Sequence, residues 1–213
     1  MTAKQKKLAL ALFEIGAIKF GDFKLKLHEK HPEAPLSPIY IDLRILRRFP
    51  DAKKLAIDVY LELVKDLKFD LIADVPTAAT ALASSLCDRL DKGMITPRAD
   101  NKTHGSGAKI DGLLIEDKGK VVVLIDDLVT QADSKLEAID TLSHAQIKVN
   151  DVVVLIDREQ GGKKQLSDKG FNLHSAFTLN QMLDLYLSER KINKSKFQDI
   201  KDRIIKLNNF LGL

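Results

Sequence analysis

The chain has 213 residues, of which 45% are hydrophobic, so it is long enough to bury a sizeable core within one domain. Its 34 basic residues are nearly matched by 30 acidic ones, and this balance, with a net charge of +4, gives no indication of nucleic-acid binding. The printed sequence contains neither a signal peptide nor an apolar span of membrane length, so we expect a cytoplasmic protein without membrane partners.

Residues 1–43 predict a helix, a loop and a short strand in that order. The first twenty residues carry apolar side chains at helical spacing. Three prolines within residues 28–38 and the lack of an apolar period predict a surface loop. Residues 40–43 are expected to form a short strand.

The next part of the chain alternates between predicted helices and strands. Asp51 is expected to cap a helix, and apolar strands are predicted at residues 71–73 and 94–95. Between these strands lies a predicted helix that ends near Leu90 and includes Cys87, the one cysteine of the chain. A lone cysteine excludes an intramolecular disulfide, and its apolar surroundings predict a core thiol rather than a nucleophile.

A long polar segment follows at residues 96–112, with the sequence TPRADNKTHGSGAKIDG. Loops of this length inside compact domains are uncommon and are usually functional or mobile. Gly105 and Gly107 suit a loop that must change its shape. We therefore expect this segment to contribute to function.

Two similar apolar runs come next. VVVLID occurs at residues 121–126 and again at residues 152–157, which is about one strand-helix-strand unit further along the chain. Two neighbouring parallel strands with similar burial would have similar sequences. Both runs are followed by charged residues. Because ligands bind beyond the carboxyl ends of the strands in open α/β sheets, this edge predicts a site for a polar, partly anionic ligand.

The first run ends in two adjacent carboxylates, Asp126 and Asp127. At about 4 Å two such charges repel by about 4 kcal/mol at an effective dielectric near 20, so they need hydroxyl donors or a cation. A sugar diol or a divalent metal would meet this need, and a solvated turn is the simpler alternative. Ser134 and Glu137 form a capping-box pattern for the next helix, whose N-terminus favours phosphate, so a ribose phosphate fits both halves of the segment.

The C-terminal part predicts two helices, each opened by a capping-box pattern. One pattern runs from Thr178 to Gln181 and the other from Ser195 to Gln198. Apolar residues at helical spacing follow each pattern. These helices are expected to pack the fold or contact another subunit rather than to carry chemistry.

Taken together, these segments resemble the type I phosphoribosyltransferases. VVVLIDDLVTQADS resembles the motif with which that family binds phosphoribosyl diphosphate (PRPP). IGAIKFGDFKLK, SPIYIDLR, RADNKTHG, DREQGGKKQL and LHSAFTLNQML resemble the orotate phosphoribosyltransferase branch, in the expected order along most of the chain. The resemblance implies one α/β domain with an open, mainly parallel sheet flanked by helices: a small hood that binds the base (residues 1–48), a core (49–177) and C-terminal helices (178–213).

For PRPP, the resemblance implies a set of binding residues at matching positions. Asp126 and Asp127 would bind the ribose hydroxyls, and Lys26 would lie near the diphosphate. The 5′-phosphate would be wrapped by Thr130, Gln131, Ala132, Asp133 and Ser134. Mg²⁺ is the implied cofactor, held by diphosphate and ribose oxygens rather than by a set of protein ligands.

For catalysis, the resemblance implies a mobile loop at residues 98–110 that contains Arg98, Lys102 and His104 and acts across the subunits of a homodimer. Asp127 is the fourth implied catalytic residue. The orotate-binding residues would be Tyr40, Ile41, Thr130 and Arg158. The implied reaction transfers the 5-phosphoribosyl group from PRPP to orotate, giving orotidine 5′-monophosphate and diphosphate, in pyrimidine (UMP) biosynthesis.

Other functions can be compared with this one. A receiver domain places its acidic pair near the N-terminus, and a dinucleotide dehydrogenase needs GxGxxG, which is absent. Ala99 stands where the family usually has a basic residue, Ala132 where it has glycine, and residues 74–80 depart from the usual diphosphate loop. A phosphoribosyltransferase for another base and a non-catalytic PRPP- or nucleotide-binding regulator therefore remain alternatives.

Overall fold

The computed structural model describes residues 1–29, 31–98 and 109–213, and its centre is a mainly parallel sheet. The described part of this sheet has seven strands: β3 (Leu71–Asp74), β4 (Met94–Pro97), β5 (Ile110–Asp111), β6 (Val121–Ile125), β7 (Leu128–Val129), β8 (Lys148–Asp157) and β9 (Asn172–Thr178). Only β5 runs antiparallel to its neighbour, β4. The predicted fold class, α/β with an open and mainly parallel sheet, is confirmed.

The longest strand, β8, organises the site. On one side it pairs with β6 along its first half and with β7 near its end, and on the other side it pairs with β9. β6 and β7 thus follow the same edge of β8, and the gap between them is Asp126-Asp127. The acidic pair interrupts a line of pairing at the carboxyl end of β6, where the apolar run gives way to charged residues.

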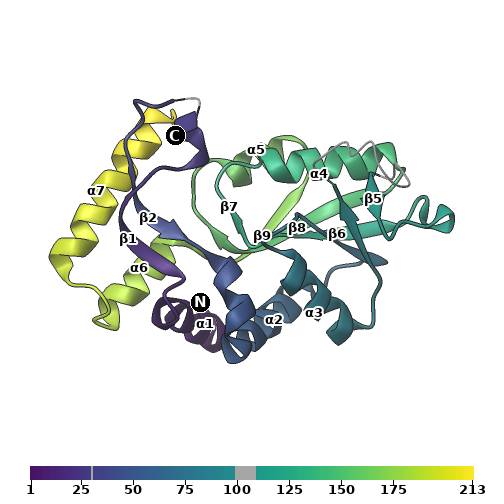
Figure 1. The fold of residues 1–213 in the computed structure, drawn as a ribbon, viewed down its shortest axis with the longest axis horizontal. Coiled ribbons are helices and arrows are strands. Elements are labelled where there is room, and N and C mark those ends of the chain that lie inside the picture. Colours follow the sequence, from purple (N-terminus) through teal and green to yellow (C-terminus); the bar gives the residue numbers. More distant parts are fainter. Residues whose placement is uncertain (30, 99–108) are drawn as a thin grey trace.

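Helices cover both faces of the sheet. α2 (Pro50–Val64) and α3 (Thr80–Leu90) lie on one face, and α4 (Asp133–His144) and α5 (Gly162–Asp168) lie on the other (Figure 1). Alternate residues of β6 belong to two apolar clusters: Val123 and Ile125 to the larger, Val122 and Leu124 to the smaller. β6 is therefore buried on both faces, which is typical of an unbroken apolar run in a parallel sheet.

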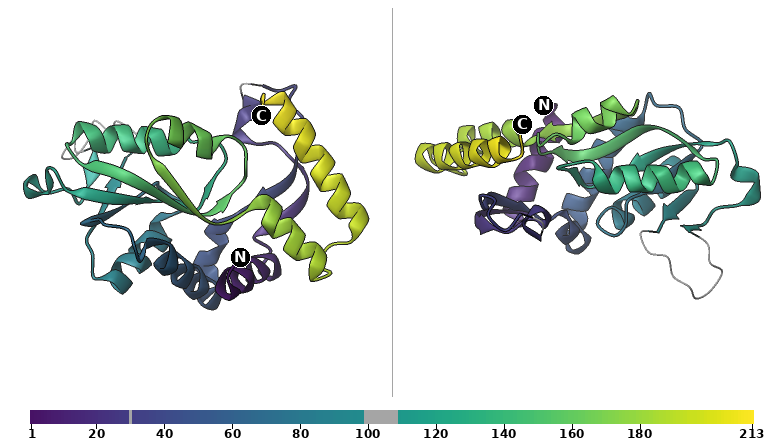
Figure 2. Two further views of the ribbon diagram at one scale, coloured as in Figure 1. Left: turned by 180° about the vertical axis from the view of Figure 1, so that it is seen from behind. Right: turned by 90° about the horizontal axis from the view of Figure 1, so that it is seen from above.

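The hood contains α1 (Ala3–Glu14) and the antiparallel pair β1 (Ile18–Phe23) and β2 (Ser37–Ile41). Short 3-10 turns lie at Lys26–Glu29, at Leu43–Arg48 and, beyond the hood, at Ile115–Asp117. The C-terminal helices are α6 (Leu179–Ser188) and α7 (Lys194–Phe210), and α7 packs along β2. Figures 1 and 2 place α7 and β5 at opposite ends of the molecule. Among the described helices, none has the length and apolar character needed to cross a bilayer.

Three predicted helix caps were each two residues too late in the chain. α2 begins at Pro50, which needs no amide partner at a first helical position, so Asp51 lies in the first turn. α4 is capped at Ala132 without a side-chain bond, so Ser134 does not form the predicted capping box. α7 is capped by Asn193 rather than Ser195, whereas the box at Thr178 and Gln181 is confirmed.

The predicted strand at residues 40–43 lies earlier than expected. β2 begins at Ser37, inside the segment predicted to be a loop, and ends at Ile41. The next residue, Asp42, accepts a hydrogen bond from the amide of Arg44 and caps the 3-10 turn that follows. The strand therefore ends at Ile41, before the apolar residue Leu43, because Asp42 caps the turn that follows.

Candidate functional site

The acidic turn, which we define as Asp126 and Asp127, is held at the carboxyl end of β6 by backbone bonds. The Asp126 amide donates to the Val153 carbonyl at 3.0 Å. The Asp126 carbonyl accepts from the Tyr60 hydroxyl at 2.7 Å, and this tyrosine is fully buried in α2. Tyr60 thus holds the acidic turn from the face of the sheet that α2 covers, opposite the face that α4 covers (Figure 1).

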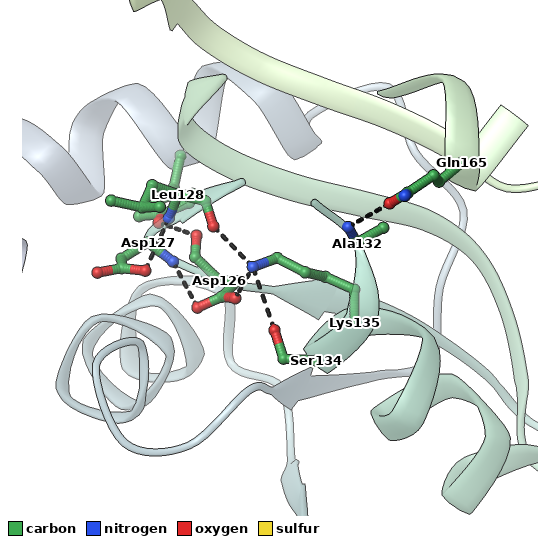
Figure 3. Close-up of polar contacts among 8 residues, drawn as sticks. Asp126, Asp127, Leu128, Ala132, Ser134, Lys135 and Gln165 are labelled. Atoms are coloured by element: carbon green, nitrogen blue, oxygen red, sulfur yellow. Dashed lines mark hydrogen bonds and ion pairs between the residues drawn. The ribbon is translucent and has the colours of Figure 1, made fainter. Parts of the chain in front are cut away.

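The carboxylate of Asp126 is buried, with the residue 4% exposed. Its Oδ1 accepts from the amide of Asp127 at 2.8 Å, and its Oδ2 lies 2.5 Å from Nζ of Lys135 (Figure 3). The same ammonium donates to the Leu128 carbonyl at 2.7 Å. Lys135 projects from the first turn of α4, so the helix and the turn are joined by a buried ion pair.

Asp127 lies in a different environment. It is half-buried, and its Oδ1 accepts from the Leu128 amide at 2.7 Å. Loss of water and the neighbouring charge of Asp126 raise the pKa of Asp127 above the ordinary carboxyl range, and Lys135 partly opposes this shift. In Figure 3 its carboxylate points to the side of the turn away from Lys135.

Residues 130–134, the phosphate loop, connect β7 to α4 and contact the start of α5. The Thr130 carbonyl accepts from the Gly162 amide at 3.0 Å, and the Ala132 amide donates to Oε1 of Gln165 at 2.7 Å (Figure 3). Asp133 and Ser134 are exposed at the N-terminus of α4. The first amides of a helix have no partner within it, so this end of α4 can bind an anion.

The other charged strand end supplies a buried guanidinium. Arg158 is 5% exposed, and its amide donates to the Val129 carbonyl at 2.9 Å, which places it beside β7 and the phosphate loop. Its Nη2 donates to the Ser37 hydroxyl of β2 at 3.2 Å, and its Nε has no partner among the described residues. Burial lowers the pKa of Arg158 to about 10, which is the expected effect of a low dielectric on an unpaired cation.

The predicted base-stacking residues lie on β2. The Tyr40 ring is 5.5 Å from the Phe23 ring, and its hydroxyl accepts from Nη2 of Arg44 at 2.9 Å. Ile41 is 6% exposed, and its side chain belongs to the larger apolar cluster. Both roles stay predictions, and a contact from Ile41 to a ligand would come from its backbone.

The predicted catalytic loop is described only at its ends. The Arg98 amide donates to the Lys109 carbonyl at 2.8 Å, and its guanidinium is paired with Asp111 of β5. Lys102 and His104 lie outside the described residues. Lys26 begins a 3-10 turn, and its side chain is not described. The roles of these residues stay predictions.

Sequence reasoning missed four residues that surround the site: Tyr60, Asp74, Lys135 and Gln165. Asp74 ends β3, is fully buried, and accepts from the hydroxyls of Thr80 and Thr96, each at 2.5 Å. One signal was available for Lys135, because it stands in the same buried stripe of α4 as Ala138, Ile139 and Leu142. A lysine in an apolar stripe indicates a buried partner.

The described residues contain no group of three or more His, Cys, Asp or Glu side chains that could hold a metal ion by itself. Oxygen-rich ligands with phosphate groups suit Mg²⁺, which commonly uses one or two carboxylates and keeps several waters.

Comparisons with known proteins place this site in context. No family model matches the chain. It is 32% identical over 207 residues to the uridine 5′-monophosphate synthase of Bos taurus, covering 96% of this chain and 41% of that protein. It is 36% identical over 172 residues to the orotate phosphoribosyltransferase of Pyrobaculum islandicum, covering 80% of this chain and 85% of that protein.

Among solved structures, the orotate phosphoribosyltransferase of Aeropyrum pernix is 30% identical with a TM-score of 0.73, covering 83% of this chain and 96% of that one. The first curated relatives are longer proteins, of which the chain spans 41% and 38%. The likeness to the Aeropyrum pernix structure shows a shared fold over most of this chain.

Proposed function

This chain belongs to the orotate phosphoribosyltransferase family, and we propose that it catalyses the transfer for which the family is named. The substrates would be PRPP and orotate, and the products orotidine 5′-monophosphate and diphosphate, in pyrimidine biosynthesis. The bond from C1 of the ribose to the diphosphate oxygen breaks, and a bond from C1 to a ring nitrogen of orotate forms as that nitrogen loses its proton.

The observation that carries this proposal is the buried guanidinium of Arg158 beside the phosphate loop. A cation that is 5% exposed and has no carboxylate partner among the described residues is costly unless a ligand completes its environment. Orotate carries a carboxylate, which a planar guanidinium binds with two parallel hydrogen bonds. The buried guanidinium of Arg158 therefore favours a base with a carboxylate, rather than a neutral base, as the substrate.

The sugar phosphate would occupy the edge of the sheet between these groups. The ribose hydroxyls would lie against the acidic turn, and the amides at the start of α4 would receive the 5′-phosphate. As the diphosphate leaves, positive charge develops on the ribose, and negative carboxylates nearby stabilise that charge. Mg²⁺ would neutralise charge on the diphosphate, held by diphosphate and ribose oxygens.

A homodimer is part of the proposal, with the loop at residues 98–110 acting on the site of the neighbouring subunit. Lys102 and His104 would stabilise the charge on the departing diphosphate, and closure of the loop would exclude water. Lys102→Ala should then lower turnover far more than PRPP affinity. Equal turnover in this variant would contradict the role of the loop.

One assay tests the proposal as a whole. Purified protein with PRPP and Mg²⁺ should consume orotate, followed by its ultraviolet absorbance, and should release diphosphate in equal amount. Adenine, guanine and uracil serve as competing bases. Binding of PRPP without consumption of any base would support a non-catalytic regulator instead, and consumption of another base alone would move the chain to a different specificity.

A further inference from the structure

The two aspartates of the acidic turn differ in their contacts. All the polar atoms of Asp126 are engaged inside the protein. Its amide donates to Val153 at 3.0 Å, and its carbonyl accepts from Tyr60 at 2.7 Å. Its carboxylate oxygens accept from the Asp127 amide at 2.8 Å and from the Lys135 ammonium at 2.5 Å. Asp126 is also 4% exposed, so its carboxylate presents almost no accessible surface to a sugar hydroxyl.

Asp127 has one carboxylate oxygen that accepts no hydrogen bond from the described residues. One carboxylate oxygen, Oδ1, accepts from the Leu128 amide at 2.7 Å. Within the described ranges, no group donates to the other oxygen, Oδ2, and the residue is half-buried rather than sealed. Figure 3 shows this carboxylate on the side of the turn opposite Lys135. Asp127 is therefore the carboxylate of the turn that can accept hydrogen bonds from a ligand.

Lys135 accounts for the difference. It is 4% exposed, and its neighbours in the buried stripe of α4 are apolar. A buried ammonium needs both a counter-charge and hydrogen-bond acceptors, and it finds them in Asp126 and in the Leu128 carbonyl at 2.7 Å. Because Leu128 follows the acidic turn, Lys135 contacts the chain on both sides of Asp127.

We infer that Asp126 and Lys135 form an internal ion pair that positions the acidic turn, and that Asp127 alone receives the ribose hydroxyls. Lys135 is then a positioning residue, because it acts on the ligand through the turn. The identity of the ligand rests on the proposed function, and the ion pair itself does not. This division of roles departs from the expectation that both aspartates bind the sugar.

Charge-removing variants separate the two roles. In Asp126→Asn/Lys135→Met both buried charges are removed together, and asparagine keeps an acceptor for the Asp127 amide. This double variant should bind PRPP, measured by calorimetry with Mg²⁺, within about threefold of wild type. Asp127→Asn should bind about 10- to 100-fold more weakly, as expected for a lost charge-assisted hydrogen bond. Lys4→Met/Glu62→Gln removes an exposed pair 2.8 Å apart and serves as the control.

Urea denaturation tests the ion pair without any ligand. Lys135→Met alone leaves Asp126 buried and unpaired, so its midpoint should fall well below that of the double variant. If Lys135→Met does not fold, Asp126→Asn alone gives the same comparison from the other side. The control pair should show no such coupling, because surface ion pairs contribute little.

Two results would overturn the inference. One is a folded double variant that binds PRPP as weakly as Asp127→Asn, which would mean that Asp126 contacts the sugar. The other is the absence of coupling between positions 126 and 135 in urea. If wild type failed to bind PRPP and consumed no orotate, the proposed function would fail, and the urea comparison would still decide whether the pair positions the turn.

Discussion

A methyl group at Gly162 should displace the phosphate loop. A Cβ built on this residue would lie 2.4 Å from Cγ2 of Val129 and 2.8 Å from the carbonyl oxygen of Thr130. Carbon atoms in contact are normally about 3.5 Å apart, so β7 must move by about 1 Å to admit the methyl group. The Gly162 amide also donates to the same carbonyl at 3.0 Å, and this bond would be strained.

We therefore expect Gly162→Ala to lose about 1–3 kcal/mol of stability through overpacking. A shift of the loop by about 1 Å should also lower turnover with PRPP by about 100-fold, because positioning of the reacting groups is sensitive on that scale. Urea denaturation gives the first quantity, and steady-state kinetics with orotate and PRPP gives the second.

Gly170→Ala is the matched control. Gly170 has φ +85° and nothing within 4 Å of a built Cβ, so alanine there is strained without a clash. It should lose about 1–2 kcal/mol of stability and keep its kinetics. Wild-type kinetics for Gly162→Ala, or equal kinetic losses in both variants, would refute the argument that packing of α5 on the loop shapes the site.

Three further predictions concern titrating groups. A raised carboxyl pKa makes the folded chain less stable as pH rises above about 4, so Asp127→Asn should gain on the order of 1 kcal/mol or more near pH 8 and nothing at low pH. Arg158→Met should weaken orotate binding by about 10- to 100-fold in calorimetry and leave uracil, which lacks the carboxylate, unaffected. Burial raises the pKa of the Cys87 thiol to about 11, so iodoacetamide at neutral pH should alkylate it only after urea unfolds the chain.

Each of these predictions has a contrary result. Destabilisation of Asp127→Asn at alkaline pH would mean that the charged form is favoured in the folded protein. Equal losses for orotate and uracil in Arg158→Met would show that the guanidinium does not select a carboxylate. Rapid alkylation of Cys87 in the native protein would contradict its place in the core.

The local pattern of the chain determined the parts of the site that lie close together in sequence. The apolar run at residues 121–125 and the charged residues after it predicted a buried strand that ends at an acidic turn, and both are confirmed. The repeat at residues 152–157 predicted a neighbouring parallel strand, which is β8. Periodicity and strand length act over a few residues, so they can be read without knowing the rest of the fold.

Tertiary structure decided which groups meet across the chain. Arg158 meets Ser37, 121 residues away, and the Ala132 amide meets Gln165 because α5 packs on the phosphate loop. Lys135 is close in sequence to Asp126, yet their contact requires the turn of α4 over the end of β6. Packing also made the two aspartates unequal, since it brings the Lys135 ammonium to the carboxylate of Asp126 and leaves Asp127 half-buried. A sequence can place two carboxylates side by side, but the fold determines which of them remains available to a ligand.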